Sequence, residues 1–120
     1  MLVVDDEPSV RMLVVDALNE HGFSCLEAAD GAAGLKVLQS TATVDLLITD
    51  VGLPGGLNGR QLADAARALR PDLKVLFITG YAENAVFNQG QVERGMEVLT
   101  KPFAVDALLG RVDRMMREPG

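Results

Sequence analysis

The fold is decided by Val44-Asp45-Leu46-Leu47-Ile48-Thr49-Asp50, a mostly apolar run that ends in a carboxylate. Such a run is typical of a buried strand. Other apolar runs also end in polar residues: residues 1–4 lead into Asp5-Asp6-Glu7, residues 74–78 into Thr79-Gly80, and residues 96–99 into Thr100-Lys101-Pro102. If the strands are parallel, these polar ends lie at one edge of the sheet, where open α/β sheets bind ligands.

Helical patterns separate the apolar runs. Pro8 suits the first turn of a helix, apolar residues then recur at helical spacing as far as Leu18, and Gly22 is placed for a left-handed cap. The alternation of strands and helices predicts one α/β domain over residues 1–120, with a parallel five-stranded sheet covered on both faces. The expected helices span residues 8–21, 31–40, 62–69, 83–89 (the weakest) and 105–116, and the expected strands span residues 2–4, 24–28, 44–49, 74–79 and 96–99.

Composition limits the classes of function. Hydrophobic residues make up 48% and charged residues 23% of the 120 residues, which is typical of a soluble globular domain. A net charge of −6 argues against direct binding of nucleic acid. No apolar run approaches the roughly 18 residues that a membrane span needs, so no membrane insertion is expected. The abrupt start, with a strand at Met1 or Leu2, favours a domain cut from a longer protein.

Two isolated residues receive ordinary interpretations. The single cysteine, Cys25, cannot form an internal disulfide, and we interpret it as buried filler in a protein of a reducing compartment. His21 is interpreted as a solvent-facing residue at a helix end, without a metal or phosphodonor role.

The strand ends gather groups that suit phosphate chemistry. Asp5, Asp6 and Asp50 would place three carboxylates together, and one of them would take up a proton unless a positive charge intervened. Mg²⁺ meets that need, because it binds oxygen ligands and commonly combines one or two carboxylates with a phosphoryl oxygen. Lys101 adds a positive charge and Thr79 a hydroxyl donor. We therefore predict a site at which an aspartate forms an acyl phosphate beside Mg²⁺.

Each of these residues also has a purely structural interpretation. An aspartate at a strand end is usually a helix cap or a solvated turn residue. The pair Asp5-Asp6 would favour the N-terminus of the following helix through its dipole. Lys101 and Thr79, taken singly, are an ordinary surface lysine and strand threonine. Their joint placement at successive strand ends is the stronger signal for chemistry.

Several segments together resemble the receiver domain of two-component response regulators. The resemblance runs in order over essentially the whole chain, and it implies a single (βα)5 flavodoxin-like, doubly wound domain with strand order 2-1-3-4-5. Residues 80–85 and 95–103 look most like receivers attached to hybrid sensor histidine kinases. The segments that carry the resemblance are Val3-Val4-Asp5-Asp6-Glu7-Pro8, Asp50 with Pro54 after it, Ile78-Thr79-Gly80 and Thr100-Lys101-Pro102-Phe103.

The resemblance implies a role for each acid at the strand ends. Asp50 would be the phosphoacceptor, Asp6 a direct Mg²⁺ ligand, and Asp5 a Mg²⁺ ligand through water. The backbone carbonyl of Gly52 would complete the metal site. Residues 52–59, which hold four glycines and a proline, would form a loop slightly longer than is usual in the family.

The resemblance also implies roles beyond the acids. Thr79 would be the switch hydroxyl, Lys101 would bind the phosphate, and the peptide bond before Pro102 would be cis. Val98 stands where receivers often carry an aromatic residue, so signalling would rely on the loop after the fourth strand and on the fourth helix. Tyr81 stands where a side chain influences the access of water to the acyl phosphate, and we expect Tyr81 to shield it.

The implied function is that of a signalling phosphoacceptor. The domain would take phosphate from a phosphohistidine of a histidine kinase or a histidine phosphotransfer domain, catalyse its own phosphotransfer and slow dephosphorylation, and control a linked output domain or a partner protein. It would not be an enzyme with an external product, although the parent chain of a hybrid protein would be a histidine kinase. Its expected location is the cytoplasm or the cytoplasmic side of a membrane-bound sensor.

Other functions remain possible on the sequence alone. A degenerate receiver would act as a phosphate-independent binding module, but the intact Asp6, Asp50, Thr79 and Lys101 argue against it. A phosphatase that forms an aspartyl phosphate usually has two acidic residues separated by one position on its first strand, whereas Asp5 and Asp6 are adjacent. A flavin-binding relative would need a phosphate loop rich in hydroxyls and glycines, where this chain has carboxylates.

Overall fold

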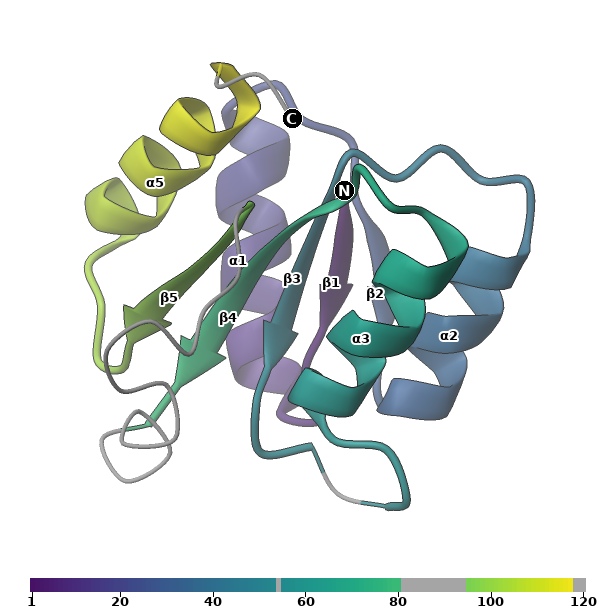
Figure 1. Cartoon of the computed structure of the whole chain (residues 1–120). Helices are drawn as coiled ribbons and strands as arrows, with labels where there is room; N and C mark the ends of the chain where they lie inside the picture. Colours follow the sequence, from purple (N-terminus) through teal and green to yellow (C-terminus); the bar gives the residue numbers. More distant parts are fainter. Residues whose placement is uncertain (54, 81–94, 118–120) are drawn as a thin grey trace.

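The computed structural model describes residues 1–53, 55–80 and 95–117 (Figure 1). Strands and helices alternate along the chain as the sequence predicts. The predicted helix over residues 83–89 lies outside the described residues. The elements are β1 (Leu2–Val4), α1 (Pro8–Glu20), β2 (Leu26–Ala28), α2 (Gly31–Gln39), β3 (Leu46–Asp50), α3 (Gly59–Leu69), β4 (Lys74–Thr79), β5 (Met96–Thr100) and α5 (Val105–Arg117).

The five strands form one parallel sheet in the order β2-β1-β3-β4-β5, which confirms the predicted topology. The register places Asp50 of β3 opposite Ile78 of β4, and Thr79 opposite Thr100 of β5. Because the strands run the same way, their polar C-terminal ends meet at one edge of the sheet, at the arrowheads in Figure 1.

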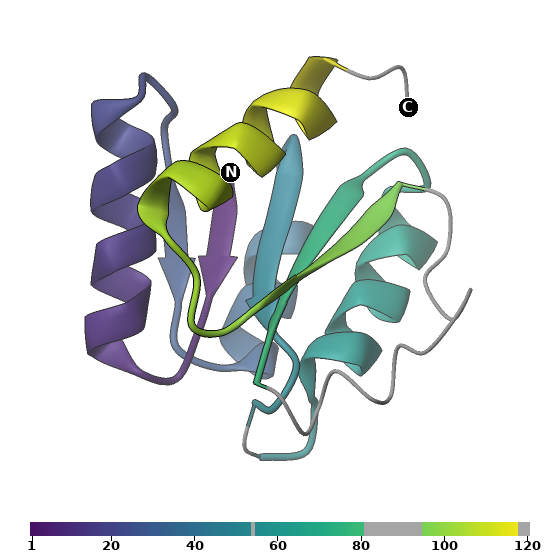
Figure 2. The ribbon, with the colours of Figure 1, turned by 90° about the vertical axis from the view of Figure 1, so that its left-hand side faces the viewer.

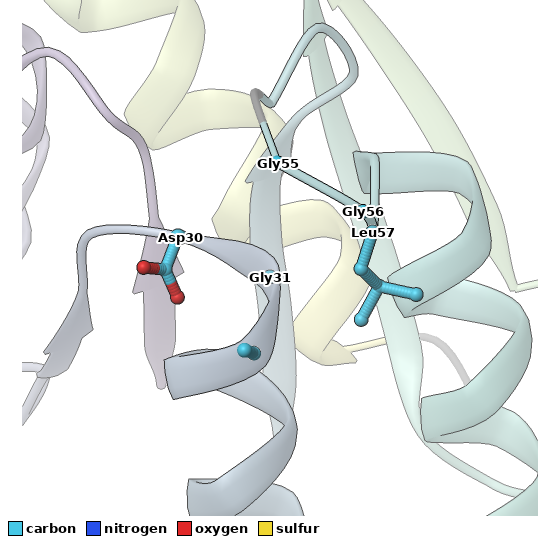
Figure 3. Close-up of a pocket in the computed structure, with 6 residues that line it drawn as sticks. Asp30, Gly31, Gly55, Gly56 and Leu57 are labelled. Atoms are coloured by element: carbon cyan, nitrogen blue, oxygen red, sulfur yellow. The ribbon is translucent and has the colours of Figure 1, made fainter.

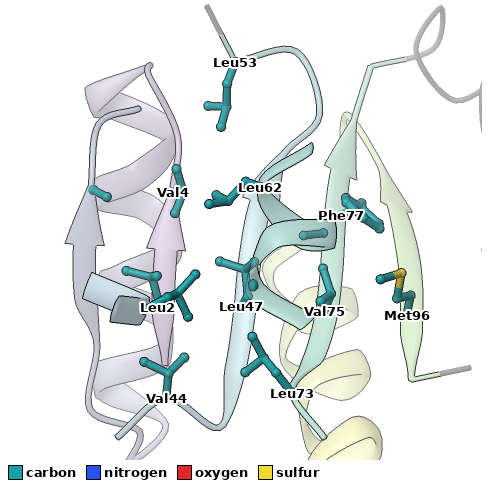
Figure 4. Packing of buried hydrophobic residues seen from close by; sticks show 14 of the residues in the cluster. Leu2, Val4, Val44, Leu47, Leu53, Leu62, Leu73, Val75, Phe77 and Met96 are labelled. Atoms are coloured by element: carbon teal, nitrogen blue, oxygen red, sulfur yellow. The ribbon is translucent and has the colours of Figure 1, made fainter. Parts of the chain in front are cut away.

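Helices cover both faces of the sheet (Figures 1 and 2). Neighbouring residues of β1 point to opposite faces, so Leu2 and Val4 join the hydrophobic cluster beneath α2 and α3, while Val3 joins the cluster beneath α1 and α5. Figure 4 shows the first cluster, with Phe77 of β4 fully buried among aliphatic side chains. Two apolar faces with helices on each explain why the strands are almost wholly apolar up to their ends.

The helices begin at local sequence signals. Pro8 occupies the first turn of α1, and Gly22 after its end has a φ of 99°, as predicted. The Asp30 side chain accepts a hydrogen bond of 2.8 Å from the N–H of Ala33 and so caps α2. A capping box between Asn58 and Gln61 starts α3.

Three predicted boundaries differ from the structure by two residues or more. The second strand begins at Leu26 and not at residue 24, because its pairing with the short strand β1 starts at Leu26, opposite Leu2. The third strand begins at Leu46, where the ladder with β4 starts. Gly59, predicted as a loop residue, is the first residue of α3, because Asn58 supplies the cap. None of the helices in the described part of the chain is long and apolar enough to cross a bilayer.

Candidate functional site

The ends of β1 and β3 bring three carboxylates together. Oxygen atoms of Asp5, Asp6 and Asp50 all lie within 4.8 Å of one another. Asp5 and Asp50 are 3% and 7% exposed, whereas Asp6 is exposed. Within residues 1–53, 55–80 and 95–117, no other group of three acidic, histidine or cysteine side chains is arranged in this way. The predicted convergence of Asp5, Asp6 and Asp50 is therefore present in the fold.

The electrostatics of the cluster favour a cation. Burial raises the pKa of Asp5, and the neighbouring charges of Asp50 and Asp6 add to the effect. The N–H of Glu7, which donates a hydrogen bond of 2.9 Å to Asp5 Oδ1, and the charge of Lys101 lower the pKa in part. A hard divalent ion with oxygen ligands would relieve the repulsion, so the donor set fits Mg²⁺.

Asp50, the last residue of β3, lies beside Lys101, which follows the end of β5. Its Oδ2 lies 3.6 Å from Nζ of Lys101, and its Oδ1 accepts a hydrogen bond of 3.3 Å from the N–H of Gly52. The backbone N–H of Lys101 donates to the carbonyl of Thr79 at 2.7 Å, so β4 fixes the lysine beside the acid. The Lys101–Pro102 peptide is cis, as expected. One oxygen of Asp50 thus faces Lys101, and the carboxylates of Asp5 and Asp6 lie near the Asp50 carboxylate.

Thr79 ends β4 in a buried position. Its side chain is fully buried, and its hydroxyl donates a hydrogen bond of 2.9 Å to the carbonyl of Gly80. The hydroxyl is therefore bonded within its own strand end in this state. If the hydroxyl donated to another acceptor, its hydrogen bond to the carbonyl of Gly80 would have to break. A change of acceptor would therefore also affect the backbone of Gly80, directly after β4.

The remaining predicted residues are placed less completely. Val98 of β5 is partly buried against the cluster that includes Phe77, its neighbour across the ladder with β4. Pro102 lies directly after Lys101 at the end of β5. Tyr81 lies outside the described residues, as does Pro54 of the loop after β3.

Sequence reasoning missed Gly59. A Cβ at this position would lie 2.0 Å from the carbonyl oxygen of Asp50 and 2.8 Å from Cα of Val51. The N–H of Gly59 also donates to the carbonyl of Val51 at 3.0 Å. The start of α3 therefore packs directly on the backbone of the central aspartate. The Asn58–Gln61 capping signal would have placed the helix start here, although it carries no information on the contact with Asp50.

Sequence reasoning also missed Arg11. This residue of α1 donates from Nη1 to the carbonyl oxygen of Asp5 at 2.7 Å and from Nε to Glu27 at 3.2 Å. No sequence signal marks it, because the contact depends on how the first turns of α1 face the end of β1.

Two hollows lie near the strand ends. Figure 3 shows the first, between the start of α2 and the loop before α3, lined by Asp30, Gly31, Ala32, Gly55, Gly56 and Leu57. It contains none of the residues of the acidic cluster. The second is an apolar groove beside the end of β5, lined by Val10, Leu13, Lys101, Pro102 and Phe103. Only the second includes a residue that contacts Asp50.

His21 and Cys25 lie apart from the cluster. His21 is exposed, as predicted, and its Nε2 lies 2.8 Å from Oδ2 of Asp113 on α5, which the sequence did not indicate. Cys25 is partly buried against the core cluster beneath α1 and α5, and burial raises the pKa of its thiol. The thiol is therefore mostly protonated and suits a packing role.

Comparisons with known proteins agree with this geometry. A family model described as "Response regulator receiver domain" matches residues 1–113. The sensor kinase CckA of Brucella abortus is 34% identical over 119 residues, which cover 98% of this chain and 12% of the kinase. The response regulator receiver protein CpdR of Brucella abortus is 33% identical, with 97% of this chain and 95% of that protein covered. The crystal structure of the receiver domain of the hybrid histidine kinase CckA has a TM-score of 0.82 at 34% identity and covers 97% of each chain.

Proposed function

Since the chain belongs to the family of response regulator receiver domains, we propose that it accepts a phosphoryl group from a phosphohistidine onto Asp50 in the presence of Mg²⁺. One observation carries the proposal: the Asp50 carboxylate lies in a cluster of three acids and 3.6 Å from the ammonium of Lys101. A buried carboxylate flanked in this way can meet both a cation and a phosphoryl group.

The proposed metal site uses Asp5, Asp6 and Asp50, with the carbonyl of Gly52 as a further ligand. The raised pKa of Asp5, caused first by burial and then by the neighbouring charges of Asp50 and Asp6, supports this proposal, because a bound divalent cation would stabilise the charged carboxylate. When bound, Mg²⁺ would neutralise negative charge on the phosphoryl oxygens. The roles of direct and water-mediated ligand for Asp6 and Asp5 are part of the same proposal.

The chemical step follows from the carboxylate. An oxygen of Asp50 attacks phosphorus, the new O–P bond forms as the P–N bond of phosphohistidine breaks, and the electron pair of that bond remains on the imidazole nitrogen. Lys101 balances charge on the transferred group, as a fixed cation does in such transfers. Later attack by water on phosphorus returns the free carboxylate and inorganic phosphate.

The proposed switch begins at Thr79. A phosphoryl group on Asp50 would offer a stronger acceptor than the carbonyl of Gly80, because its oxygens are charged. The hydroxyl would leave Gly80, and the backbone after β4 would move with it. Val98, which is smaller than an aromatic residue, would leave the segment after Thr79 as the main carrier of the change.

The proposed partners are a histidine kinase or a histidine phosphotransfer domain as donor, and a linked domain or a separate protein as output. The groove beside Lys101 offers the donor an apolar surface next to the acceptor, with Leu13 47% exposed. The chain spans 12% of the CckA kinase and 95% of CpdR. The relatives of this chain therefore include a kinase of which it matches a small part and a receiver protein of which it matches nearly all. Such donors would place the domain in the cytoplasm or at the cytoplasmic side of a sensor.

Incubation with Mg²⁺ and acetyl phosphate, followed by intact-mass measurement, tests the proposal. We expect an added mass of one phosphoryl group in the parent and none in Asp50→Asn, which keeps the shape of the side chain but lacks the nucleophile. A parent that acquires no phosphoryl group would instead favour the phosphate-independent binding module.

A further inference from the structure

Arg11 joins three elements beside the acidic cluster. Its Nη1 donates a hydrogen bond of 2.7 Å to the carbonyl oxygen of Asp5, and its Nε lies 3.2 Å from Oε1 of Glu27 on β2. Its own backbone N–H donates to the carbonyl of Glu7 at 3.0 Å, in the first turn of α1. The guanidinium therefore ties the end of β1 to both β2 and α1, with its side chain only 20% exposed.

Two other polar groups of Asp5 are held by backbone. Its N–H donates to the carbonyl of Ala28 at 3.2 Å, and its Oδ1 accepts a hydrogen bond of 2.9 Å from the N–H of Glu7. Its carbonyl is the group that Arg11 contacts. Arg11 is thus the side chain that holds the carbonyl of Asp5, in addition to these two backbone hydrogen bonds.

The contact at the carbonyl has a geometric consequence for two acids. The carbonyl of Asp5 belongs to the planar peptide unit that leads into Asp6. A bond to that oxygen fixes the tilt of the plane, and hence the direction in which the exposed side chain of Asp6 leaves the backbone. The hydrogen bond from Nη1 of Arg11 goes to the backbone carbonyl of Asp5 and not to a carboxylate of the cluster, so the effect of Arg11 is on orientation. Lys101, by contrast, provides the counter-charge to Asp50.

The ion pair with Glu27 serves the same geometry. An arginine–glutamate pair with Glu27 51% exposed stabilises a fold very little by itself. It does, however, hold Nε of Arg11, and the planar guanidinium then points Nη1 at the Asp5 carbonyl. The pair therefore orients the guanidinium.

We infer that Arg11 is a positioning residue for Mg²⁺ binding: by holding the peptide between Asp5 and Asp6, it keeps their carboxylates directed toward Asp50. The inference rests on the proposed function, since it takes Mg²⁺ to be the ion of the cluster. Residues that orient metal ligands commonly change metal affinity by about tenfold or more when they are removed.

Isothermal titration with Mg²⁺ alone tests the inference without any phosphotransfer. We expect Arg11→Ala to weaken Mg²⁺ binding about tenfold. Arg11→Lys should give an intermediate loss, because one ammonium cannot hold the Asp5 carbonyl and Glu27 in the fixed fork of a guanidinium. Glu27→Gln keeps an acceptor for Nε and should cost less than Arg11→Ala.

Arg114→Ala is the matched control. It removes another arginine–glutamate ion pair, that of Arg114 with Glu97, near the C-terminal end of α5. Its Mg²⁺ affinity should equal that of the parent. Circular dichroism establishes that each variant is folded, and Arg11→Lys decides the question if Arg11→Ala does not fold.

The outcomes separate the inference from the function on which it rests. Folded Arg11 variants that bind Mg²⁺ within about twofold of the parent would overturn the positioning role, where about tenfold is expected. If those variants keep parental affinity while the parent still acquires phosphate from acetyl phosphate, only the inference fails. If the parent acquires no phosphate, the proposed function fails, whatever the affinity of the Arg11 variants.

Discussion

Gly59 lies against the backbone of Asp50 so closely that a Cβ on the glycine would be 2.0 Å from the Asp50 carbonyl oxygen. The neighbour is backbone, which cannot rotate away as a flexible side chain would. The first turn of α3 and the end of β3 are therefore packed as one unit, and the position of Asp50 depends on the absence of a side chain at residue 59.

Gly59→Ala should lower the free energy of unfolding by about 1–3 kcal/mol, because the extra methyl group forces backbone to shift. It should also slow the phosphorylation of Asp50. Urea unfolding and intact-mass kinetics measure the two effects. Gly110→Ala in α5 is the control, since no atom would lie within 4 Å of a Cβ at residue 110. Alanine there should stabilise the protein by about 0.5–1 kcal/mol. Equal stability of Gly59→Ala and the parent would contradict the close packing.

Asp5→Asn should stabilise the metal-free protein at neutral pH. Burial raises the pKa of Asp5 above its ordinary value of 3.8, so the folded state holds this proton more tightly than the unfolded state. The charged form therefore costs stability above the raised pKa, and the cost vanishes as the pH falls below 3.8. Urea unfolding should show that Asp5→Asn is more stable than the parent at pH 7 and equally stable at low pH.

The same Asp5→Asn variant should lose the stabilisation that Mg²⁺ gives the parent. A ligand that binds only the folded state raises the apparent stability, and the variant lacks one of the three carboxylates of the proposed metal site. A rise of the melting temperature with Mg²⁺ that is equal in variant and parent would remove Asp5 from the metal site.

Lys101→Met should slow phosphorylation of Asp50 by roughly 100-fold, the usual cost of removing one fixed group that stabilises developing negative charge. Methionine keeps much of the length and apolar contact of lysine but carries no charge. The measurement is the initial rate of mass increase with acetyl phosphate. Lys36→Met on α2 is the control and should react at the parental rate. A parental rate in Lys101→Met would show that the 3.6 Å contact with Asp50 has no part in the transfer.

Thr79→Val should leave Asp50 able to take up phosphate but remove much of the structural response. Valine matches the shape of threonine and cannot donate to a phosphoryl oxygen. Amide NMR spectra before and after phosphorylation should show changes beyond the site in the parent and in Thr79→Ser, and far fewer in Thr79→Val. The same pattern of changes in all three proteins would contradict a switch through the hydroxyl.

The sequence predicted the site better than it predicted what supports it. Asp5, Asp6, Asp50, Thr79 and Lys101 follow apolar strands, and a parallel sheet brings such ends together whatever the details of packing. Strand order came from the resemblance to a known family and agrees with the sheet. Both kinds of inference need only the order of elements along the chain.

Contacts between elements could not be predicted in the same way. Gly59 looked like one of several loop glycines, and its importance comes from the approach of α3 to the backbone of Asp50. No pattern in the sequence marked Arg11, and its inferred role rests on the hydrogen bond to the carbonyl of Asp5. Both depend on how two elements face each other, which neither periodicity nor composition records. The start of β2 was misplaced because an edge strand begins where its pairing with the neighbouring strand begins, here at Leu26 opposite Leu2.

Phosphorylation by phosphoramidate shows whether Asp50 accepts a phosphoryl group from nitrogen, because this small donor carries a P–N bond like that of phosphohistidine. The parent, Asp50→Asn and the parent with Mg²⁺ removed by a chelator are followed by intact mass, and the modified peptide is identified. We expect one phosphoryl group on Asp50 in the parent with Mg²⁺ and none in the other two samples. Phosphate on another residue, or a parent that stays unmodified with Mg²⁺ present, would contradict the proposed function.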